Sequence, residues 1–208
     1  MPDYHIPLIP DKTYHIFSRA MGKEKLFFEE DNYRYFLKQF SKYISPVADT
    51  FAYNLLPNHF HFMIRVKNNN VIHQEFLKIK KNKKFSVEVV PEFIMERFSN
   101  LLNSYTKAFN KKYSRIGGLF IDIMRRVEII EDSQVGATIF YIHKNAVHHG
   151  YVDKISDWRW SSYHSIISNA PTQLVRDEIL DWFGGVTPFI KFHKQPIYLK
   201  DAIVNDDE

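Results

Sequence analysis

The sequence has no cysteine among its 208 residues. This absence excludes disulfide bonds, thiolate catalysis and zinc sites built on cysteine, and it is compatible with a reducing compartment. No apolar run reaches the roughly 18 residues that a membrane-spanning helix needs. The first residues also lack the basic-then-apolar pattern of a secretory signal. We therefore expect a soluble, cytoplasmic protein.

Aromatic residues are abundant, with 18 Phe and 12 Tyr, and hydrophobic residues make up 45% of the chain. This composition is sufficient for one substantial core with an appendage. Residues 1–150 hold 22 Lys and Arg against 15 Asp and Glu, a net charge of +7, whereas residues 151–208 hold 6 against 9, a net charge of −3. A basic body with an acidic tail predicts a polyanionic partner for the body, although ordinary solvated lysines would give the same composition.

Residues 58–66 place two histidines on one side of an apolar segment. Phe60 and Phe62 alternate with His59 and His61, and this period of two predicts a β-strand with one buried face. Side chains two residues apart in a strand project together, so the two imidazoles share a face. Neutral imidazoles in that arrangement can bind one divalent cation. The alternative is a half-exposed strand that happens to carry two histidines.

The remaining elements follow from periodicity and from capping and turn residues. Strands are predicted at residues 13–19, 49–56, 58–66 and 124–130, and helices at residues 31–45, 91–112 and 133–147. The order β-α-β-β-α-β predicts an α+β fold, a ferredoxin-like split βαβ sandwich with an antiparallel sheet. We expect one domain over residues 13–150 with a lysine-rich excursion at residues 68–90. A C-terminal helical extension over residues 151–208 would pack on the core.

Tyr105 is a candidate nucleophile because it lies on the inward stripe of the helix predicted at residues 91–112. A phenol can attack phosphorus in line when a cation polarises the phosphodiester, and the product is a phosphotyrosine linkage. This chemistry requires the helix to cross the sheet face that carries the histidines. The alternative is a core aromatic residue whose hydroxyl finds a partner inside the fold.

Five short motifs occur in one order along the chain: LPNHFHFM at residues 56–63, SYTKAFNKK at 104–112, RIGGLF at 115–120, YIHKN at 141–145 and WSSY at 160–163. Together they resemble the single-tyrosine HUH transposase family, the transposase IS200-like domain, and most closely its branch of REP-associated tyrosine transposases. The resemblance runs from about residue 13 to residue 165. It implies a ferredoxin-like DNA endonuclease for transposition or recombination. Such an enzyme binds hairpin-forming single-stranded DNA, nicks it through a 5′-phosphotyrosine intermediate and can rejoin the ends.

The resemblance also implies roles for individual residues. His59 and His61 match the metal-binding pair, and Tyr105 matches the nucleophile. Better-known members carry a metal-binding Gln four residues after the tyrosine, whereas this chain has Phe109, which cannot bind a metal. Asn110 follows and is a candidate third ligand. We expect magnesium or manganese, because phosphate oxygens and water suit hard cations, with zinc or nickel able to compete for the imidazoles.

Basic side chains are expected to surround the site and contact phosphates: Arg19, Lys107, Lys111, Lys112, Arg115, Arg125 and Arg126. The partner would be single-stranded hairpin DNA, bound by a monomer or a homodimer that is associated with the nucleoid when bound. Two alternatives stay open. One is a catalytically idle nucleic-acid-binding protein that retains the fold, and the other is a metal-dependent hydrolase in which Tyr105 is structural.

Overall fold

The computed structural model describes residues 3–81, 83–121 and 124–195. Its centre is a four-stranded antiparallel sheet in the order β2-β3-β1-β4. The strands are β1 (Thr13–Arg19), β2 (Ala48–Leu56), β3 (His59–Val66) and β4 (Arg125–Ile129). Strand β3 lies between β1 and β2, which is the split βαβ arrangement. The predicted α+β fold class is confirmed.

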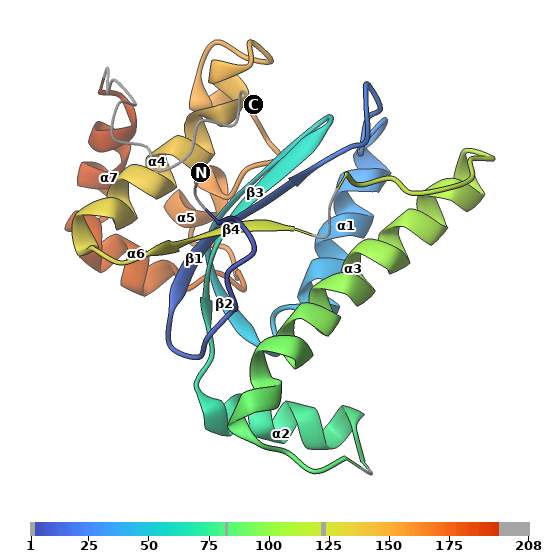
Figure 1. The fold of residues 1–208 in the computed structure, drawn as a ribbon. Coiled ribbons are helices and arrows are strands. Elements are labelled where there is room, and N and C mark those ends of the chain that lie inside the picture. Colours follow the sequence, from blue (N-terminus) through green and yellow to red (C-terminus); the bar gives the residue numbers. More distant parts are fainter. Residues whose placement is uncertain (1–2, 82, 122–123, 196–208) are drawn as a thin grey trace.

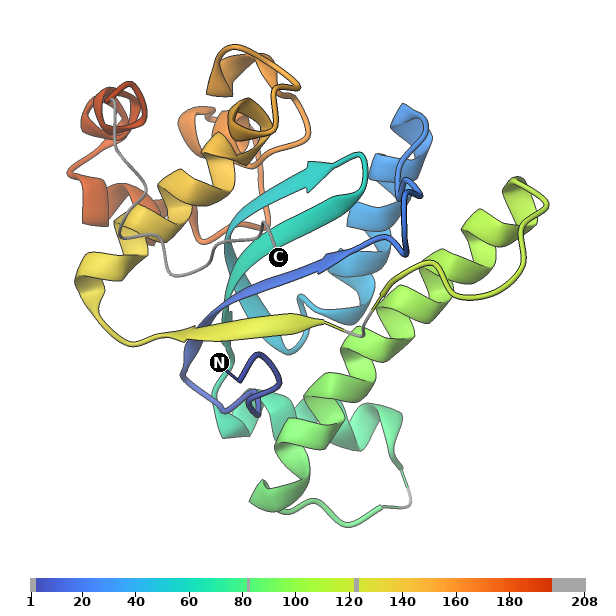
Figure 2. The same ribbon diagram turned by 45° about the horizontal axis from the view of Figure 1, so that its top comes forward.

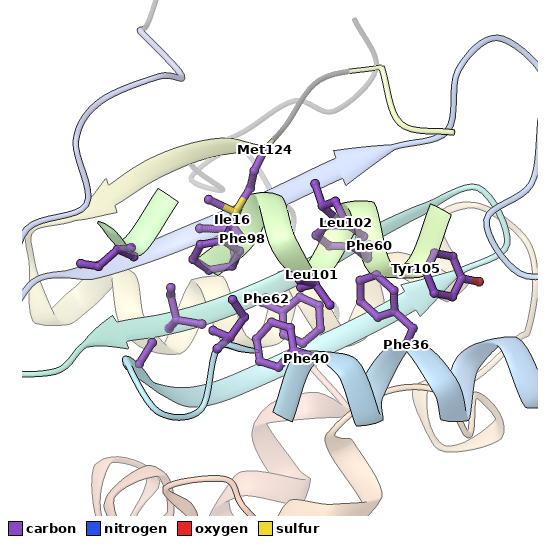
Figure 3. Packing of buried hydrophobic residues seen from close by; sticks show 14 of the residues in the cluster. Ile16, Phe36, Phe40, Phe60, Phe62, Phe98, Leu101, Leu102, Tyr105 and Met124 are labelled. Carbon is purple, nitrogen blue, oxygen red and sulfur yellow. The ribbon is translucent and has the colours of Figure 1, made fainter. Parts of the chain in front are cut away.

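Two helices, α1 (Glu30–Tyr43) and α3 (Val90–Lys112), pack against each other and cover one face of the sheet (Figure 1). Helix α1 begins just before the predicted residue, because Glu29 and Asn32 form a reciprocal capping box. Its apolar stripe meets β3, where the rings of Phe40 and Phe62 stack with centroids 4.0 Å apart. Figure 3 shows this core, to which Tyr105 contributes its ring.

The lysine-rich segment after β3 contains a helix, α2 (Asn69–Ile79), and a 3₁₀ turn at Val87–Val89. The side chain of Asn68 caps α2 by accepting a hydrogen bond from the backbone N–H of Val71 at 3.1 Å. Lys80 Nζ lies 2.6 Å from Glu96 Oε1 and so links this segment to α3. Figure 1 places α2 beside the N-terminal end of α3, away from the start of β3.

The second face of the sheet is covered by α4 (Asp132–His148), α5 (Tyr163–Ile167), α6 (Arg176–Phe183) and α7 (Val186–His193) (Figures 1 and 2). The two guanidinium nitrogens of Arg65 on β3 lie 2.7 and 2.9 Å from the carboxylate oxygens of Glu178 on α6. Residues 196–208, the end of the expected C-terminal extension, lie outside the described residues. No helix in the described part of the chain is long and apolar enough to cross a membrane.

A buried histidine pair joins α4 to α7. His143 Nδ1 lies 2.9 Å from His193 Nε2, and His143 Nε2 lies 2.7 Å from Ser162 Oγ. His193 Nδ1 lies 2.9 Å from the Phe189 carbonyl oxygen, which can only accept, so this nitrogen carries the proton. Burial lowers the pKa of His193 to about 4, although the hydrogen bond to Phe189 opposes the shift. The fold therefore favours the neutral form of this ring.

This pair should make the free energy of unfolding depend on pH. The pKa of His193 is lower in the fold than its unfolded value of about 6.5, so the unfolded chain binds more protons between about pH 6.5 and pH 4. Stability is full above that window and falls as the pH drops through it, by roughly 3 kcal/mol for His193 alone. Urea unfolding across this pH range measures the loss. His193→Gln should reduce the pH dependence and the exposed control His164→Gln should keep it, so equal slopes in all three proteins would contradict the prediction.

Candidate functional site

The two histidines of β3 face the same side of the sheet, as the strand periodicity predicts. The rings of His59 and His61 lie nearly perpendicular, with centroids 5.2 Å apart. His61 is buried, with 1% of its surface exposed, whereas His59 is half-buried at the start of the strand. The alternating residues Phe60 and Phe62 belong to the opposite core under α1 and α3. The imidazoles therefore face the α4 side of the sheet.

His61 is surrounded by other rings. Its Nδ1 atom lies 3.0 Å from Nε2 of His15 on β1, and its ring contacts the ring of Phe17 with centroids 5.9 Å apart. Burial holds the pKa of His61 well below its ordinary value, and repulsion from His59 and His149 lowers it further. A neutral imidazole at neutral pH retains a nitrogen lone pair, which is the form that can bind a metal.

Helix α4 brings Tyr141 and Asn145 to the histidine face. The ring of Tyr141 lies edge-on to both His61 and His15, with each pair of centroids 5.8 Å apart. Asn145 Oδ1 lies 2.9 Å from His59 Nε2. The two residues are four positions apart, so they share one face of the helix. A phenol, two imidazoles and an amide thus meet between α4 and β3.

The contacts of His59 constrain the amide of Asn145. His59 Nδ1 lies 2.8 Å from Asn58 Oδ1, and a neutral ring has only one N–H to donate to the two oxygens beside it. Asn145 is fully buried, and its Nδ2 atom has no hydrogen-bond partner within the described part of the chain. If Nδ1–H donates to Asn58 Oδ1, the lone pair of His59 Nε2 faces Asn145 Oδ1, and a cation bound between these two acceptors would satisfy both.

This donor set is suited to a divalent cation. Two imidazole nitrogens and one amide oxygen would leave further coordination positions for water or phosphate oxygens. Asn145 can present its oxygen, because Oδ1 lies 2.9 Å from His59 Nε2. Within the described ranges there is no group of three or more His, Cys, Asp or Glu side chains that could hold a metal ion. A third ligand would therefore have to come from a residue such as Asn145.

Tyr105 lies on the wrong face of the sheet for its predicted role. Its ring packs beside Phe36 under α1 and α3 (Figure 3). It also contacts Phe27, and only 1% of its surface is exposed. Its hydroxyl donates a hydrogen bond to the Leu26 carbonyl oxygen. Burial raises the pKa of Tyr105 far above its ordinary value. The expectation that its helix crosses the histidine face is wrong, because α3 covers the opposite face.

Asn110, the candidate third ligand, is also remote from the histidines. Its Nδ2 donates to the Gly117 carbonyl oxygen at 2.9 Å, and its Oδ1 accepts from Arg115 Nη1 at 3.0 Å. Both ends of the amide therefore stabilise the turn that follows α3. Arg115 also binds both Glu24 carboxylate oxygens at 2.6 Å, so it belongs to the same turn. The proposed metal contact of Asn110 does not fit this placement.

Apart from Arg115 and Arg126, the predicted basic residues fall into two groups. Arg19 is exposed and opposite His59 in the β1–β3 register, and Arg125 lies on the same face, with its guanidinium 5.7 Å from the Tyr4 ring. Lys107, Lys111 and Lys112 are exposed on α3, on the other side of the sheet, and Lys112 Nζ lies 2.7 Å from Glu29 Oε1. Only the first group lies near the histidines.

Arg126 is not a surface residue, contrary to its predicted phosphate contact. Only 6% of its surface is exposed, and its guanidinium donates hydrogen bonds to the carbonyl oxygens of His5, Ile6 and Met124. These contacts fasten the N-terminal segment to β4. A side chain held by three backbone carbonyls and covered by protein stabilises the fold and does not present its charge to a nucleic acid.

The motif at residues 141–145 contains a sequence signal for Tyr141 and Asn145 that the assignment of Tyr105 left unused. A metal-binding amide is expected four residues after the nucleophilic tyrosine in the better-known relatives. The residue four positions after Tyr105 is Phe109, which has no amide. The residue four positions after Tyr141 is Asn145, which has one. His15 carried no comparable signal, because its neighbour His61 is 46 residues away in the sequence.

Comparisons with known proteins agree with this architecture. No family model matches the chain. A Haemophilus influenzae protein named as a candidate REP-associated tyrosine transposase is 26% identical over 119 residues, which cover 56% of this chain and 59% of that protein. The match thus spans less than two thirds of that relative. A solved structure of a REP-associated tyrosine transposase bound to a REP hairpin has a TM-score of 0.60 at 17% identity, over 82% of this chain and 89% of that one. In sequence this chain is similar to one protein of that name, and it has the fold of the solved REP-associated tyrosine transposase.

Proposed function

We propose that this protein binds hairpin-forming single-stranded DNA and nicks it with Tyr141, in a metal-dependent strand-transfer reaction. The observation that carries the proposal is the meeting of Tyr141 with His59, His61 and Asn145 between α4 and β3. The partner is supported by the structural neighbour, which is bound to a REP hairpin. Tyr141 replaces Tyr105 as the proposed nucleophile because of its place beside the imidazoles.

The proposed reaction is a transesterification at phosphorus. The phenol oxygen of Tyr141 forms a bond to the phosphorus of a DNA phosphodiester, and the bond from phosphorus to the 3′ oxygen breaks. The proton lost by the phenol is balanced by the proton that the leaving 3′ oxygen takes up. The products are a 5′-phosphotyrosine linkage and a free 3′ hydroxyl. Attack by a 3′ hydroxyl on the same linkage reverses the step and joins the strands.

His59, His61 and Asn145 are the residues that would hold the cation, magnesium or manganese. When bound there, such a cation would polarise the phosphodiester and offset the charge that develops during attack. The protein itself positions the reacting groups. Helix α4 holds the phenol and the amide on one face, and β3 holds both imidazoles beneath them. Arg19 and Arg125, on the same sheet face, would bind the flanking phosphates.

A second candidate is a catalytically idle nucleic-acid-binding protein with the same fold. The burial of Tyr141 favours it, since only 7% of that residue's surface is exposed and a DNA strand would have to reach the hydroxyl. The nicking enzyme and the idle binder would use the same DNA-binding surface, and they differ in one reaction product. Only the nicking enzyme forms a covalent bond between the protein and DNA.

Substitution of the two tyrosines separates their roles. Tyr141→Phe should still bind hairpin DNA but form no covalent adduct and no nick, because it removes the attacking oxygen and keeps the ring. Tyr105→Phe is the matched control, and it should retain nicking with a stability loss of about 1 kcal/mol for its one hydrogen bond. The measurement is a denaturing gel of labelled single-stranded hairpin DNA incubated with manganese.

Three outcomes of this experiment are informative. Loss of the adduct in Tyr105→Phe and its retention in Tyr141→Phe would contradict the assignment of Tyr141 as the nucleophile. If neither variant nicks the DNA, the experiment does not show which tyrosine attacks. Tyr105→Phe is then not a valid control, because that substitution also abolishes nicking. If the unaltered protein binds the hairpin and forms no adduct in the presence of manganese, the protein is the idle binder.

Charge removal on the two faces of the sheet tests the binding surface. The double variant Arg19→Ala/Arg125→Ala should weaken binding to hairpins of every sequence. It should also lower the slope of log affinity against log salt by about 1.4, or roughly 0.7 for each single-strand phosphate contact. Lys107→Ala/Lys111→Ala removes the same charge from α3 and should leave both quantities nearly unchanged. Fluorescence anisotropy over a salt series measures the affinity and the slope. A larger loss in Lys107→Ala/Lys111→Ala than in Arg19→Ala/Arg125→Ala would place the DNA on the α3 side.

A further inference from the structure

We propose that His15 is a positioning residue that determines which ring nitrogen of His61 binds the cation. This inference rests on the proposed function, because it assigns a role within the same site. His15 lies on β1, and its side chain points to the α4 side of the sheet, as do those of Phe17 and Arg19. It touches the imidazole of His61 and the ring of the proposed nucleophile, Tyr141.

The contact between the two histidines has the geometry of a hydrogen bond between rings. His15 Nε2 lies 3.0 Å from His61 Nδ1, and the ring planes are inclined by only 27°. Both residues are buried, with 2% and 1% of their surfaces exposed. Two ring nitrogens 3.0 Å apart leave room for one hydrogen between them, so a single proton is shared across this contact.

That proton can sit in two places, and only one suits a metal site. If His61 donates from Nδ1, its Nε2 atom carries the lone pair that binds a cation. If His15 donates from Nε2, then His61 carries its own proton on Nε2, and a protonated nitrogen is not a ligand. Because Nδ1 is engaged with His15 in both cases, Nε2 is the nitrogen by which His61 would bind.

The required arrangement has both rings protonated at Nδ1, with His15 Nε2 as the acceptor. Histidines that bind metals commonly donate their other N–H to a neighbouring acceptor, and losing that acceptor typically weakens metal affinity by 10-fold to 100-fold. Here the acceptor is another imidazole, supplied by the adjacent strand. His15 therefore acts on the cation through His61, without touching the cation itself.

Two substitutions separate this role from packing. His15→Phe keeps an aromatic ring against Phe17 and Tyr141 but removes the acceptor, so His61 loses its partner. His15→Gln supplies an amide oxygen that can accept from His61 Nδ1. The control is His73→Phe, which changes an exposed histidine on α2 that stacks on Phe85. The probe is zinc, a diamagnetic cation that binds imidazole, titrated alone and without DNA.

Two readouts test the proposal. Long-range ¹H–¹⁵N correlation spectra of the metal-free protein should show His61 protonated at Nδ1, and zinc should shift its Nε2 resonance. Calorimetry should give a zinc affinity about 10-fold to 100-fold weaker for His15→Phe, within a few-fold of the parent for His15→Gln, and unchanged for His73→Phe. His61 protonated at Nε2 in the metal-free protein would overturn the inference, as would parental zinc affinity in a folded His15→Phe.

The outcome is separable from that of the nicking assay. If the protein nicks hairpin DNA while His15→Phe keeps parental zinc affinity, the inference fails and the proposed function stands. If the spectra and affinities follow the expected pattern while the protein forms no DNA adduct, the inference stands and the nicking activity fails. Should His15→Phe not fold, the tautomer of His61 in the unaltered protein and the affinity of His15→Gln still decide the matter.

Discussion

The alternation of side chains along β3 organises both halves of the molecule, because each face of this central strand is buried against different helices. Phe60 and Phe62 enter the aromatic core under α1 and α3, while His59 and His61 face α4. A slip of one residue in the strand pairing would exchange these sets and put two imidazoles into the aromatic core. Hydrogen bonding to β1 on one side and β2 on the other holds the register.

Helix α4 is held over the histidines by polar contacts with other elements. Toward the sheet, Asn54 Nδ2 on β2 donates to the Ile142 carbonyl oxygen at 2.7 Å. Elsewhere on the helix, His143 joins His193 of α7 and Ser162 in a buried chain of hydrogen bonds, and Ser162 Oγ also accepts from the backbone N–H of Tyr53 on β2. Since buried polar groups are costly unless they are paired, these contacts favour one placement of the helix. The C-terminal helices thus support the residues of the candidate site, although they contribute none of its proposed ligands.

The two tyrosines considered as nucleophiles show how environment separates residues of one type. Tyr105 is enclosed by aromatic rings and donates its hydroxyl proton to the Leu26 carbonyl oxygen, so it fills space and satisfies a backbone group. Tyr141 instead packs edge-on to two imidazoles, on the helix face that also carries Asn145. A cation held beside Tyr141 would stabilise negative charge near its oxygen, whereas the surroundings of Tyr105 disfavour its ionised form.

The sequence by itself determined the four strands of the sheet, the long helices α1, α3 and α4, the β-α-β-β-α-β order and the shared face of His59 and His61, because periodicity and capping are local properties of the chain. It also contained the four-residue spacing from Tyr141 to Asn145. Only the tertiary structure decided that α3 covers the aromatic face and α4 the histidine face, and so which tyrosine meets the imidazoles. The contacts of Arg126 and the pairing of His15 with His61 were likewise decided by the fold. The physical reason is that the side of a sheet on which a helix lies depends on how distant segments compete to bury the two faces, and no local pattern records that competition.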